Sequence, residues 1–360
     1  MGERVLMKGA EAAAEGAIRA GCRYFFGYPI TPQNEVASYM SRRMPEVGGT
    51  YLQAESEVAS INMVLGAAAA GVRAMTSSSS PGISLMQEGI SYMVGCEVPA
   101  VVMNFVRGGP GLGGIGPSQC DYFQATKGGG HGDYNLVVLG PSSIQELVDM
   151  MGDAFEIADR YRNPVLILAD GIIAQMMEAV EFKQSVDSTP LSRKPWAVTG
   201  AKGRRKNIIN SLDLIPEKLE KHNWDLQAKF KQAALDEVRW EEYCLEGAEL
   251  VLVCFGTVAR IAKKSVDNAR AAGIPIGLIR PISLWPFSVA PFEKVMPSAK
   301  KFLVVEMNTG QMLEDVRLAV AGRRPIAFHG KPGGTTYNPE LIDQVIHQAL
   351  EKERFDEHSN

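Results

Sequence analysis

The chain has 360 residues, and its 37 Lys and Arg side chains are opposed by 41 Asp and Glu, for a net charge of -4. This balance leaves no basic excess to cover a nucleic-acid backbone, and no apolar run approaches the ~20 residues that cross a membrane. The five cysteines are odd in number and form no Cys-x-x-Cys pair, which argues against a disulfide framework and a cysteine-based zinc or iron–sulfur site. We expect a reduced, cytoplasmic protein of two or three domains that binds neither nucleic acid nor membrane.

In chain order, helices and strands alternate over the first half of the sequence. The expected helices cover residues 8–20, 32–43, 56–70, 82–94 and 142–159, and the expected strands cover residues 23–27, 50–53, 72–76, 99–106, 135–139 and 164–169. The strands are nearly continuous in apolar residues, which is typical of a parallel sheet covered by helices on both faces. We place this first domain at residues 1–182.

Charged residues of both signs become dense over residues 183–247, which we interpret as a charged helical connector. Apolar residues at helical spacing predict one long helix over residues 216–245, with its charges on a solvated face. A second α/β domain is expected over residues 248–360. Its predicted elements are a strand at 250–255, a helix at 258–272, strands at 276–280 and 302–305, a helix at 312–321 and a strand at 325–328.

The turn after the first predicted strand carries Tyr28, Pro29, Ile30 and Thr31. In open parallel sheets ligands bind beyond the carboxyl ends of the strands, so these residues are binding candidates. Thr31 stands where a helix cap is expected, and capping alone would explain it. Alternatively, a rigid turn presents the Thr31 hydroxyl and nearby backbone N–H groups to an anion.

Glu57 lies at the start of the helix expected over residues 56–70. An acidic residue in a first turn complements the helix dipole, which is the simplest explanation. The same helix is rich in glycine and alanine and could pack very closely, so that Glu57 would be partly buried. A buried carboxylate needs a partner or a proton, which makes Glu57 a candidate for function.

Two further strand ends are unusual. Residues 76–82 read Thr-Ser-Ser-Ser-Ser-Pro-Gly, so Ser79 and Ser80 either line a polar pocket or form a flexible surface turn. After the strand over 99–106, Arg107 opens a glycine-rich loop with Gly108 and Gly109. A guanidinium at that place can bind a carboxylate or phosphate, and glycines allow a ligand to approach the backbone closely.

Glycines return at residues 128–132, around His131. A lone histidine is more often a hydrogen-bonded loop residue than a catalyst, and both alternatives stay open for His131. The glycine-rich loops match neither a Walker A phosphate loop nor a Rossmann fingerprint, because the required Lys and the helix-opening glycine spacing are absent.

Taken together, these segments resemble the alpha subunit of 2-oxoacid:ferredoxin oxidoreductases, in order and in spacing, over essentially the whole chain. The segments are residues 28–32, 53–57, 76–82, 107–111 and 130–133. The likeness is greatest to the branched-chain (2-oxoisovalerate) type, with the 2-oxoglutarate and pyruvate types as near relatives. The resemblance implies a pyrimidine-binding domain of the thiamin-diphosphate fold, followed by a smaller transketolase C-terminal-like α/β domain.

The resemblance also implies roles. Glu57 matches the glutamate that hydrogen-bonds the aminopyrimidine ring of thiamin diphosphate and thereby activates the cofactor. Thr31 and Arg107 match residues that hold the keto group and the carboxylate of the 2-oxoacid, and His131 is a further substrate-binding candidate. The cofactor-binding candidates are Tyr28, Pro29, Ile30, Glu57, Ser79, Ser80, Gly108 and Gly109.

The implied reaction is the oxidative decarboxylation of a 2-oxoacid, which uses coenzyme A and yields acyl-CoA and CO2. The resemblance favours 3-methyl-2-oxobutanoate as the 2-oxoacid. This sequence lacks a complete diphosphate–metal motif, because Asp170 follows Ala169 where that motif begins with glycine, and we interpret Asp170 as a strand end. The resemblance places Mg2+ and the diphosphate half-site on a beta subunit, and iron–sulfur clusters on partner subunits. Gamma and ferredoxin-like delta subunits would complete a dimer of heteromers that passes electrons to ferredoxin.

Other functions remain open at this point. The substrate could be 2-oxoglutarate or pyruvate, because a carboxylate-binding arginine serves every 2-oxoacid. The chain could belong to a thiamin-dependent decarboxylase that passes no electrons to ferredoxin. It could also be a docking subunit without catalysis, although the presence of Glu57, Thr31 and Arg107 argues against that.

Overall fold

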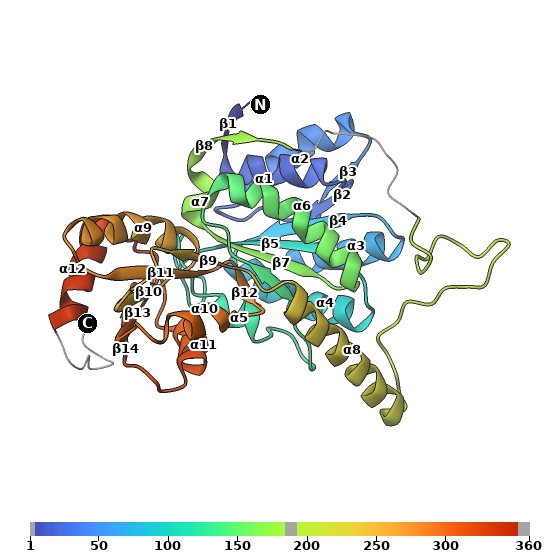
Figure 1. The fold of residues 1–360 in the computed structure, drawn as a ribbon. Helices are drawn as coiled ribbons and strands as arrows, with labels where there is room; N and C mark the ends of the chain where they lie inside the picture. The colour runs from blue at the N-terminus through green and yellow to red at the C-terminus, as the bar shows by residue number, and fades with distance from the viewer. Residues whose placement is uncertain (1–3, 184–192, 352–360) are drawn as a thin grey trace.

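A computed structural model describes residues 4–183 and 193–351 (Figure 1). Its centre is a sheet of seven strands, six of them parallel. The strands lie in the order β12 (Ser283–Trp285), β6 (Val137–Leu139), β7 (Val165–Asp170), β5 (Val101–Val106), β4 (Ala74–Ser78), β2 (Tyr24–Gly27) and β3 (Thr50–Gln53). The predicted parallel α/β fold is confirmed.

Helices cover both faces of this sheet. One face packs against α1 (Gly9–Arg19), α2 (Asn34–Glu46) and α6 (Ile144–Tyr161), and the other against α3 (Glu57–Ala69) and α4 (Ser80–Gly95). Side chains of β5 alternate between the two apolar clusters: Val102 belongs to the cluster with α3 and α4, and its neighbour Met103 to the cluster with α1, α2 and α6. The continuous apolar sequence of the strand is therefore explained by burial on both faces.

Smaller elements border the large sheet. A two-stranded antiparallel sheet joins β1 (Arg4–Lys8) to β8 (Met177–Glu181). Short helices α5 (Tyr122–Thr126) and α7 (Gly171–Gln175) follow β5 and β7. None of these four elements is predicted from the sequence, because each is too short for a periodic pattern.

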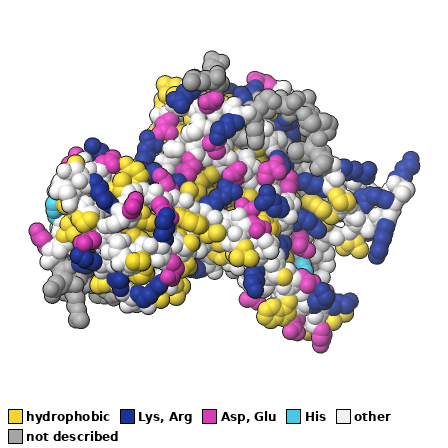
Figure 2. Space-filling view, viewed as in Figure 1, with side chains coloured by type: hydrophobic (Ala, Val, Ile, Leu, Met, Phe, Trp, Pro, Cys, Tyr) yellow, Lys and Arg dark blue, Asp and Glu magenta, His cyan; other side chains and the backbone are white. Residues whose placement is uncertain are grey.

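The connector differs from the prediction. Helix α8 (Pro216–Asp236) ends nine residues earlier than expected, and the following residues form β9 (Trp240–Tyr243), antiparallel to β11 (Ile276–Pro281). Before α8, residues 193–215 form no helix or strand, and the middle of this segment extends away from the body (Figure 1). Figure 2 shows Lys and Arg side chains gathered at the tip of this extended segment, where the sequence places Lys202, Arg204, Arg205 and Lys206.

The second sheet has five strands. Their order is β14 (Ile326–Gly330), β13 (Lys301–Glu306), β10 (Leu250–Val253), β11 and β9, and all pairs but the last are parallel. The helices of this part are α9 (Gly256–Ala271), α10 (Ala290–Val295), α11 (Gln311–Val320) and α12 (Pro339–Glu351). No helix of the described residues is long and apolar enough to cross a membrane.

Two strands cross the predicted domain boundaries. β9 lies within the predicted connector, residues 183–247, yet it completes the second sheet. β12 lies within the predicted second domain, residues 248–360, yet it pairs with β6 of the first sheet. The division at residues 182 and 247 stays a prediction of how the chain is organised. The pairings of β9 and β12 link the predicted parts through shared sheets.

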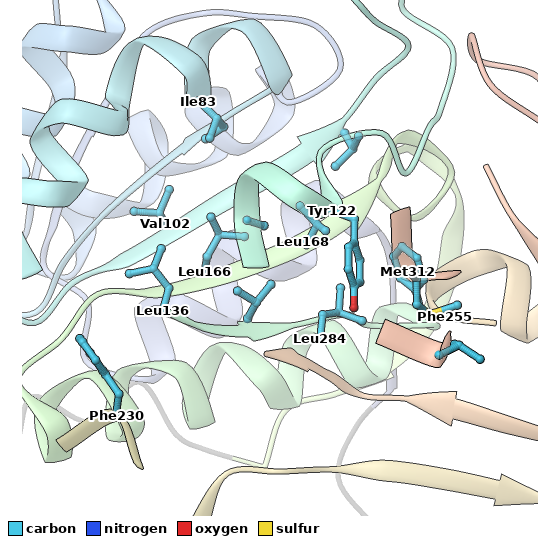
Figure 3. Close-up of a cluster of buried hydrophobic side chains, with 14 of the residues drawn as sticks. Ile83, Val102, Tyr122, Leu136, Leu166, Leu168, Phe230, Phe255, Leu284 and Met312 are labelled. Carbon is cyan, nitrogen blue, oxygen red and sulfur yellow. The ribbon is translucent and has the colours of Figure 1, made fainter. Parts of the chain in front are cut away.

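One apolar cluster is shared by both sheets, as Figure 3 shows around Tyr122. The ring of Tyr122 lies 5.6 Å from that of Phe255, and its hydroxyl donates to Asp315 Oδ2 at 2.7 Å. Gln119 extends the same junction: its Nε2 donates to the Phe255 carbonyl and its Oε1 accepts from Met307 N, both at 2.9 Å. Gln119 thus lies where the strand order of the second sheet reverses, between the ends of β10 and β13.

Glu306 is a buried carboxyl at the end of β13. It accepts hydrogen bonds from Asn308 Nδ2 at 2.8 Å, Met312 N at 2.9 Å and Leu313 N at 3.0 Å. Burial raises the pKa of Glu306 to about 7, although these hydrogen bonds oppose the rise. A proton on this group therefore influences the stability of the fold near neutral pH.

We expect Gln119→Met to lower the free energy of unfolding by about 2–4 kcal/mol, because it leaves the buried Phe255 carbonyl and Met307 N–H unpaired. Urea denaturation followed by tryptophan fluorescence measures this. Gln232→Met is the matched control, since exposed Gln232 bonds Asp236 on the surface of α8, and its effect should stay within about 0.5 kcal/mol. Equal stability of the two variants would contradict the account of the junction.

Glu306 also predicts a pH dependence. Its pKa is higher in the folded than in the unfolded chain, so its contribution to stability is full below pH 4.5 and is lost as the pH rises to about 7. The shift corresponds to about 3 kcal/mol. We expect the difference in free energy of unfolding between wild type and Glu306→Gln to fall by that order between pH 4.5 and 7. A difference that does not change with pH would show that Glu306 keeps its ordinary pKa.

Candidate functional site

The candidate residues follow four neighbouring strands of the large sheet. β2 pairs with β3 on one side and β4 on the other, and β4 pairs with β5. Thr31 follows β2, Glu57 follows β3, Ser79 follows β4 and Arg107 follows β5. Parallel strands end at one edge, so residues from four distant parts of the chain gather there. The strand order reverses between β2 and β4, which is where such sheets bind ligands.

Arg107 joins two of these strand ends. It is 7% exposed, and its Nη1 donates to the Thr31 carbonyl at 3.0 Å and its Nη2 to the Leu112 carbonyl at 3.1 Å. The backbone N–H of Arg107 donates to Ser80 Oγ at 3.1 Å. Its Nε is buried and has no partner among the described residues. The guanidinium is thus fixed in place with a donor left over.

Thr31 does not cap the next helix. α2 begins at Asn34 with Gln33 at the cap position, so the capping explanation is wrong and the Thr31 side chain is exposed. Tyr28 and Pro29 in the same turn are exposed and Ile30 is half-buried. The turn therefore presents its side chains outward from the strand edge.

Glu57 is the first residue of α3, and Ser56 caps that helix by accepting from Ala59 N at 3.2 Å. The Glu57 side chain is buried, at 7% exposure, and no described residue donates a hydrogen bond to it or forms an ion pair with it. A Cβ at Gly82 would lie 2.7 Å from Glu57 Oε1 and 2.1 Å from Ser78 Oγ. Glycine at position 82 therefore lets the Glu57 and Ser78 side chains pack directly against the start of α4, where any side chain would collide with both.

The serine-rich segment is not a flexible surface turn, as one alternative had it. Ser77 and Ser78 end β4, and Ser79 precedes α4, all fully buried. The hydroxyls of Ser78 and Ser79 have no hydrogen-bond partner among the described residues. Ser80 begins α4, and its backbone N–H donates to Asn104 Oδ1 at 3.1 Å. Two buried hydroxyls without partners indicate a site that a polar ligand would complete.

The glycine-rich loop packs against the second part of the chain. A Cβ at Gly108 would lie 3.0 Å from the Gly333 carbonyl group, so a side chain there would require the backbone at Gly333 to shift by a few tenths of an ångström. Gly109 lines a cavity of about 440 Å³ between the two sheets, together with Ser80, Cys120 and Thr309. Cys120 Sγ donates to the Arg107 carbonyl at 3.2 Å. The loop thus joins the strand-end site to the junction of the two sheets.

His131 lies apart from this cluster. Its carbonyl accepts from Ser91 Oγ at 2.8 Å, near the far end of α4 from Ser80. Eleven residues of helix separate Ser80 from Ser91, which corresponds to about 16 Å. His131 lines a different groove, of about 480 Å³, against α8. Within this chain the structure does not bring His131 together with Thr31 and Arg107.

Asp170 ends β7 and caps α7, with Oδ1 accepting from Ile172 N at 2.9 Å and Ile173 N at 3.3 Å. Burial raises the pKa of its carboxyl. This confirms the interpretation of Asp170 as a strand end. No group of three His, Cys, Asp or Glu in residues 4–183 and 193–351 could hold a metal ion.

Three residues of this site are not marked by any of the sequence patterns. Gln33 lies within the predicted helix 32–43 and Asn104 within an apolar strand, yet both are buried and hydrogen-bonded at the strand edge. Gly82 ends the serine-rich segment and begins the helix expected over residues 82–94, and neither place marks it as a site residue. A polar residue inside an otherwise apolar strand, as at Asn104, was a signal that could have been read.

The arrangement fits part of a thiamin diphosphate site. A buried carboxylate without a partner can hold a proton-bearing ring nitrogen, and the free hydroxyls of Ser78 and Ser79 can accept or donate hydrogen bonds beside it. Because residue 82 is glycine, Glu57 and Ser78 can both lie against the start of α4. The residues present therefore fit the aminopyrimidine half of the cofactor.

Comparisons with known proteins point the same way. Residues 15–237 match the family model described as pyruvate flavodoxin/ferredoxin oxidoreductase, thiamine diphosphate-binding. Residues 248–342 match the family model of pyruvate:ferredoxin oxidoreductase core domain II. Together the two models cover most of the chain.

Similar proteins include the ketoisovalerate oxidoreductase subunit VorB of Methanothermobacter marburgensis, which is 49% identical over 91% of this chain and 93% of that protein. The 2-oxoglutarate synthase subunit KorA of Methanocaldococcus jannaschii is 37% identical over 94% of this chain and 98% of that protein.

A solved structure of 2-oxoglutarate:ferredoxin oxidoreductase from Magnetococcus marinus, with 2-oxoglutarate, coenzyme A and succinyl-CoA bound, superposes with a TM-score of 0.86 at 28% identity. It matches 97% of this chain, which spans 66% of that one. A split-gene transketolase shares the fold alone, with a TM-score of 0.60 at 13% identity over 98% of this chain and all of that one. The chain therefore belongs to the 2-oxoacid:ferredoxin oxidoreductase family, as an alpha-type subunit of a multi-subunit enzyme.

Proposed function

We propose that this chain supplies the aminopyrimidine-binding half of a thiamin diphosphate site, together with residues that hold a 2-oxoacid. One observation carries the proposal: four adjacent strand ends gather the unpaired Glu57 carboxylate, the free hydroxyls of Ser78 and Ser79, and the fixed guanidinium of Arg107. When bound, thiamin diphosphate supplies a carbon nucleophile for the 2-oxoacid.

Glu57 would hold a proton shared with the aminopyrimidine ring at its carboxylate oxygen. Its burial strengthens that hydrogen bond, because little water competes at 7% exposure. Ser78 and Ser79 would take up the polar edge of the cofactor with their free hydroxyls. Tyr28, Pro29 and Ile30 form the outward turn that would border it.

Arg107 would bind the carboxylate of the substrate. Two of its five N–H donors hold the Thr31 and Leu112 carbonyls, and the buried Nε is without a partner among the described residues. The Thr31 hydroxyl, which is exposed beside it, would orient the keto oxygen. Arg107 therefore fixes the backbone of Thr31 and binds substrate with the donors that remain.

We propose 3-methyl-2-oxobutanoate as the substrate, with coenzyme A as co-substrate and acyl-CoA and CO2 as products. The similarity to a ketoisovalerate oxidoreductase subunit at 49% identity favours it. 2-Oxoglutarate is the second candidate, because a 2-oxoglutarate synthase subunit is 37% identical over nearly the same length.

The remaining parts of the enzyme belong to other chains in this proposal. A beta subunit would bind Mg2+ and the diphosphate, and partner subunits would carry the iron–sulfur clusters that pass two electrons to ferredoxin. Two features support the division: the site residues fit the ring half of the cofactor, and no group of three or more His, Cys, Asp or Glu in the described part of the chain could hold a metal ion.

Glu57→Gln should lower kcat of the assembled complex by about 100-fold or more, because a neutral amide cannot hold the proton in the same way. Thiamin diphosphate affinity, measured by calorimetry, should fall as well. Glu55→Gln is the matched control, because Glu55 lies two residues away with an exposed side chain. If Glu57→Gln kept activity within about twofold of wild type, Glu57 would not be the residue that holds the aminopyrimidine ring.

The isolated chain should show no turnover of any 2-oxoacid, and the complex purified with its natural partners should. An assay with coenzyme A and an artificial electron acceptor should give a higher kcat/KM for 3-methyl-2-oxobutanoate than for 2-oxoglutarate or pyruvate. Turnover by the isolated chain would contradict the half-site. A higher kcat/KM for 2-oxoglutarate would identify 2-oxoglutarate as the substrate. A complex that contains no iron–sulfur clusters would contradict electron transfer to ferredoxin.

A further inference from the structure

Gln33 is a fully buried amide at the reversal of strand order in the large sheet. Its Nε2 donates to the Tyr28 carbonyl at 3.0 Å, and its Oε1 accepts from Ser77 Oγ at 2.6 Å. Its backbone N–H also donates to the Ile30 carbonyl at 3.0 Å. One side chain thus connects the turn after β2 with the end of β4.

This connection lies beyond the point where the backbone pairing between β2 and β4 ends. β2 and β4 pair at Tyr24 with Ala74 and at Phe25 with Met75, and the ladder ends there. In the same register Gly27 would face Ser77, but these residues share no backbone pair. The Gln33 side chain bridges the gap, so the two strand ends keep a fixed separation where the sheet opens toward the site.

The turn that carries Thr31 is held from both sides. Gln33 holds its first residue, Tyr28, while Arg107 Nη1 holds the Thr31 carbonyl at 3.0 Å. Gln175 Nε2 holds the next carbonyl, of Pro32, at 2.9 Å. The backbone is fixed at three points, and the Thr31 side chain stays exposed. The position of the Thr31 side chain is therefore set by the hydrogen bonds that hold the Tyr28, Thr31 and Pro32 carbonyls.

We propose that Gln33 is a positioning residue, which aims the Thr31 hydroxyl at the 2-oxoacid by tying the turn after β2 to Ser77 of β4. The inference rests on the proposed function, in which Thr31 orients the keto oxygen. Gln33 itself is buried below the turn and acts through Thr31. A displacement of about 1 Å at a reacting group can cost ~100-fold in rate, so such a bridge matters for catalysis.

The test compares three variants in the assembled complex. Gln33→Met keeps the length of the side chain and removes both hydrogen bonds, and Ser77→Ala removes one of them. Gln145→Met makes the same chemical change in a glutamine that bonds Glu181 of β8 and touches none of the site residues. We expect kcat/KM for the 2-oxoacid to fall by about 10- to 100-fold in Gln33→Met, less in Ser77→Ala, and within about twofold in Gln145→Met.

A double-mutant cycle distinguishes an effect of Gln33 through Thr31 from a general loss of structure. If Gln33 acts through Thr31, then Gln33→Met should cost less than about twofold in a Thr31→Val background. Hydrogen–deuterium exchange adds a readout independent of turnover: in the complex without thiamin diphosphate, amides of residues 28–33 should exchange faster in Gln33→Met than in wild type. The rest of the large sheet should be unchanged.

Fully additive losses in the cycle, or unchanged exchange over residues 28–33, would overturn the positioning role. Wild-type activity of Gln33→Met would overturn it as well. Failure of the proposed function gives a different result: neither wild type nor Gln145→Met would oxidise a 2-oxoacid, whereas the exchange experiment would still report whether Gln33 holds the turn.

Discussion

The reversal of strand order between β2 and β4 is the constraint on which the rest of the site depends. Because the chain adds β3 on one side of β2 and β4 on the other, the connections diverge and leave an opening at the carboxyl edge. Several buried polar residues, among them Gln33, Glu57 and Ser77, gather at that opening. A sheet with uniformly ordered strands would place Thr31, Glu57 and Arg107 beneath crossing helices instead of at an edge.

The polar groups at this edge fit a site that a bound cofactor completes. Glu57 is buried without a partner, and the Ser78 and Ser79 hydroxyls are unpaired among the described residues. Buried hydroxyls without partners, such as those of Ser78 and Ser79, cost free energy until a ligand satisfies them. The junction around Tyr122 and Gln119, by contrast, is hydrogen-bonded and lies in the apolar cluster that the two sheets share.

Much of this could be predicted from the sequence, and what was missed has physical causes. Continuous apolar strands and alanine-rich helices gave the parallel α/β class, and the polar residues after each strand gave Thr31, Glu57, Ser79, Ser80 and Arg107 as candidates. Short elements such as β9 escaped because Trp240 to Tyr243 form a strand only through pairing with β11, which no local pattern reveals. Gln33 escaped because its role depends on Ser77, 44 residues away. The separation of His131 from the cluster likewise depends on the position of α4.

A structure of the assembled complex with thiamin diphosphate bound tests the central claim most directly. The account predicts that a ring nitrogen of the aminopyrimidine lies within hydrogen-bond distance, about 3 Å, of the Glu57 carboxylate. It also predicts that the diphosphate and its Mg2+ contact a different subunit. A cofactor whose diphosphate is held by this chain, or whose ring lies away from Glu57, would contradict it.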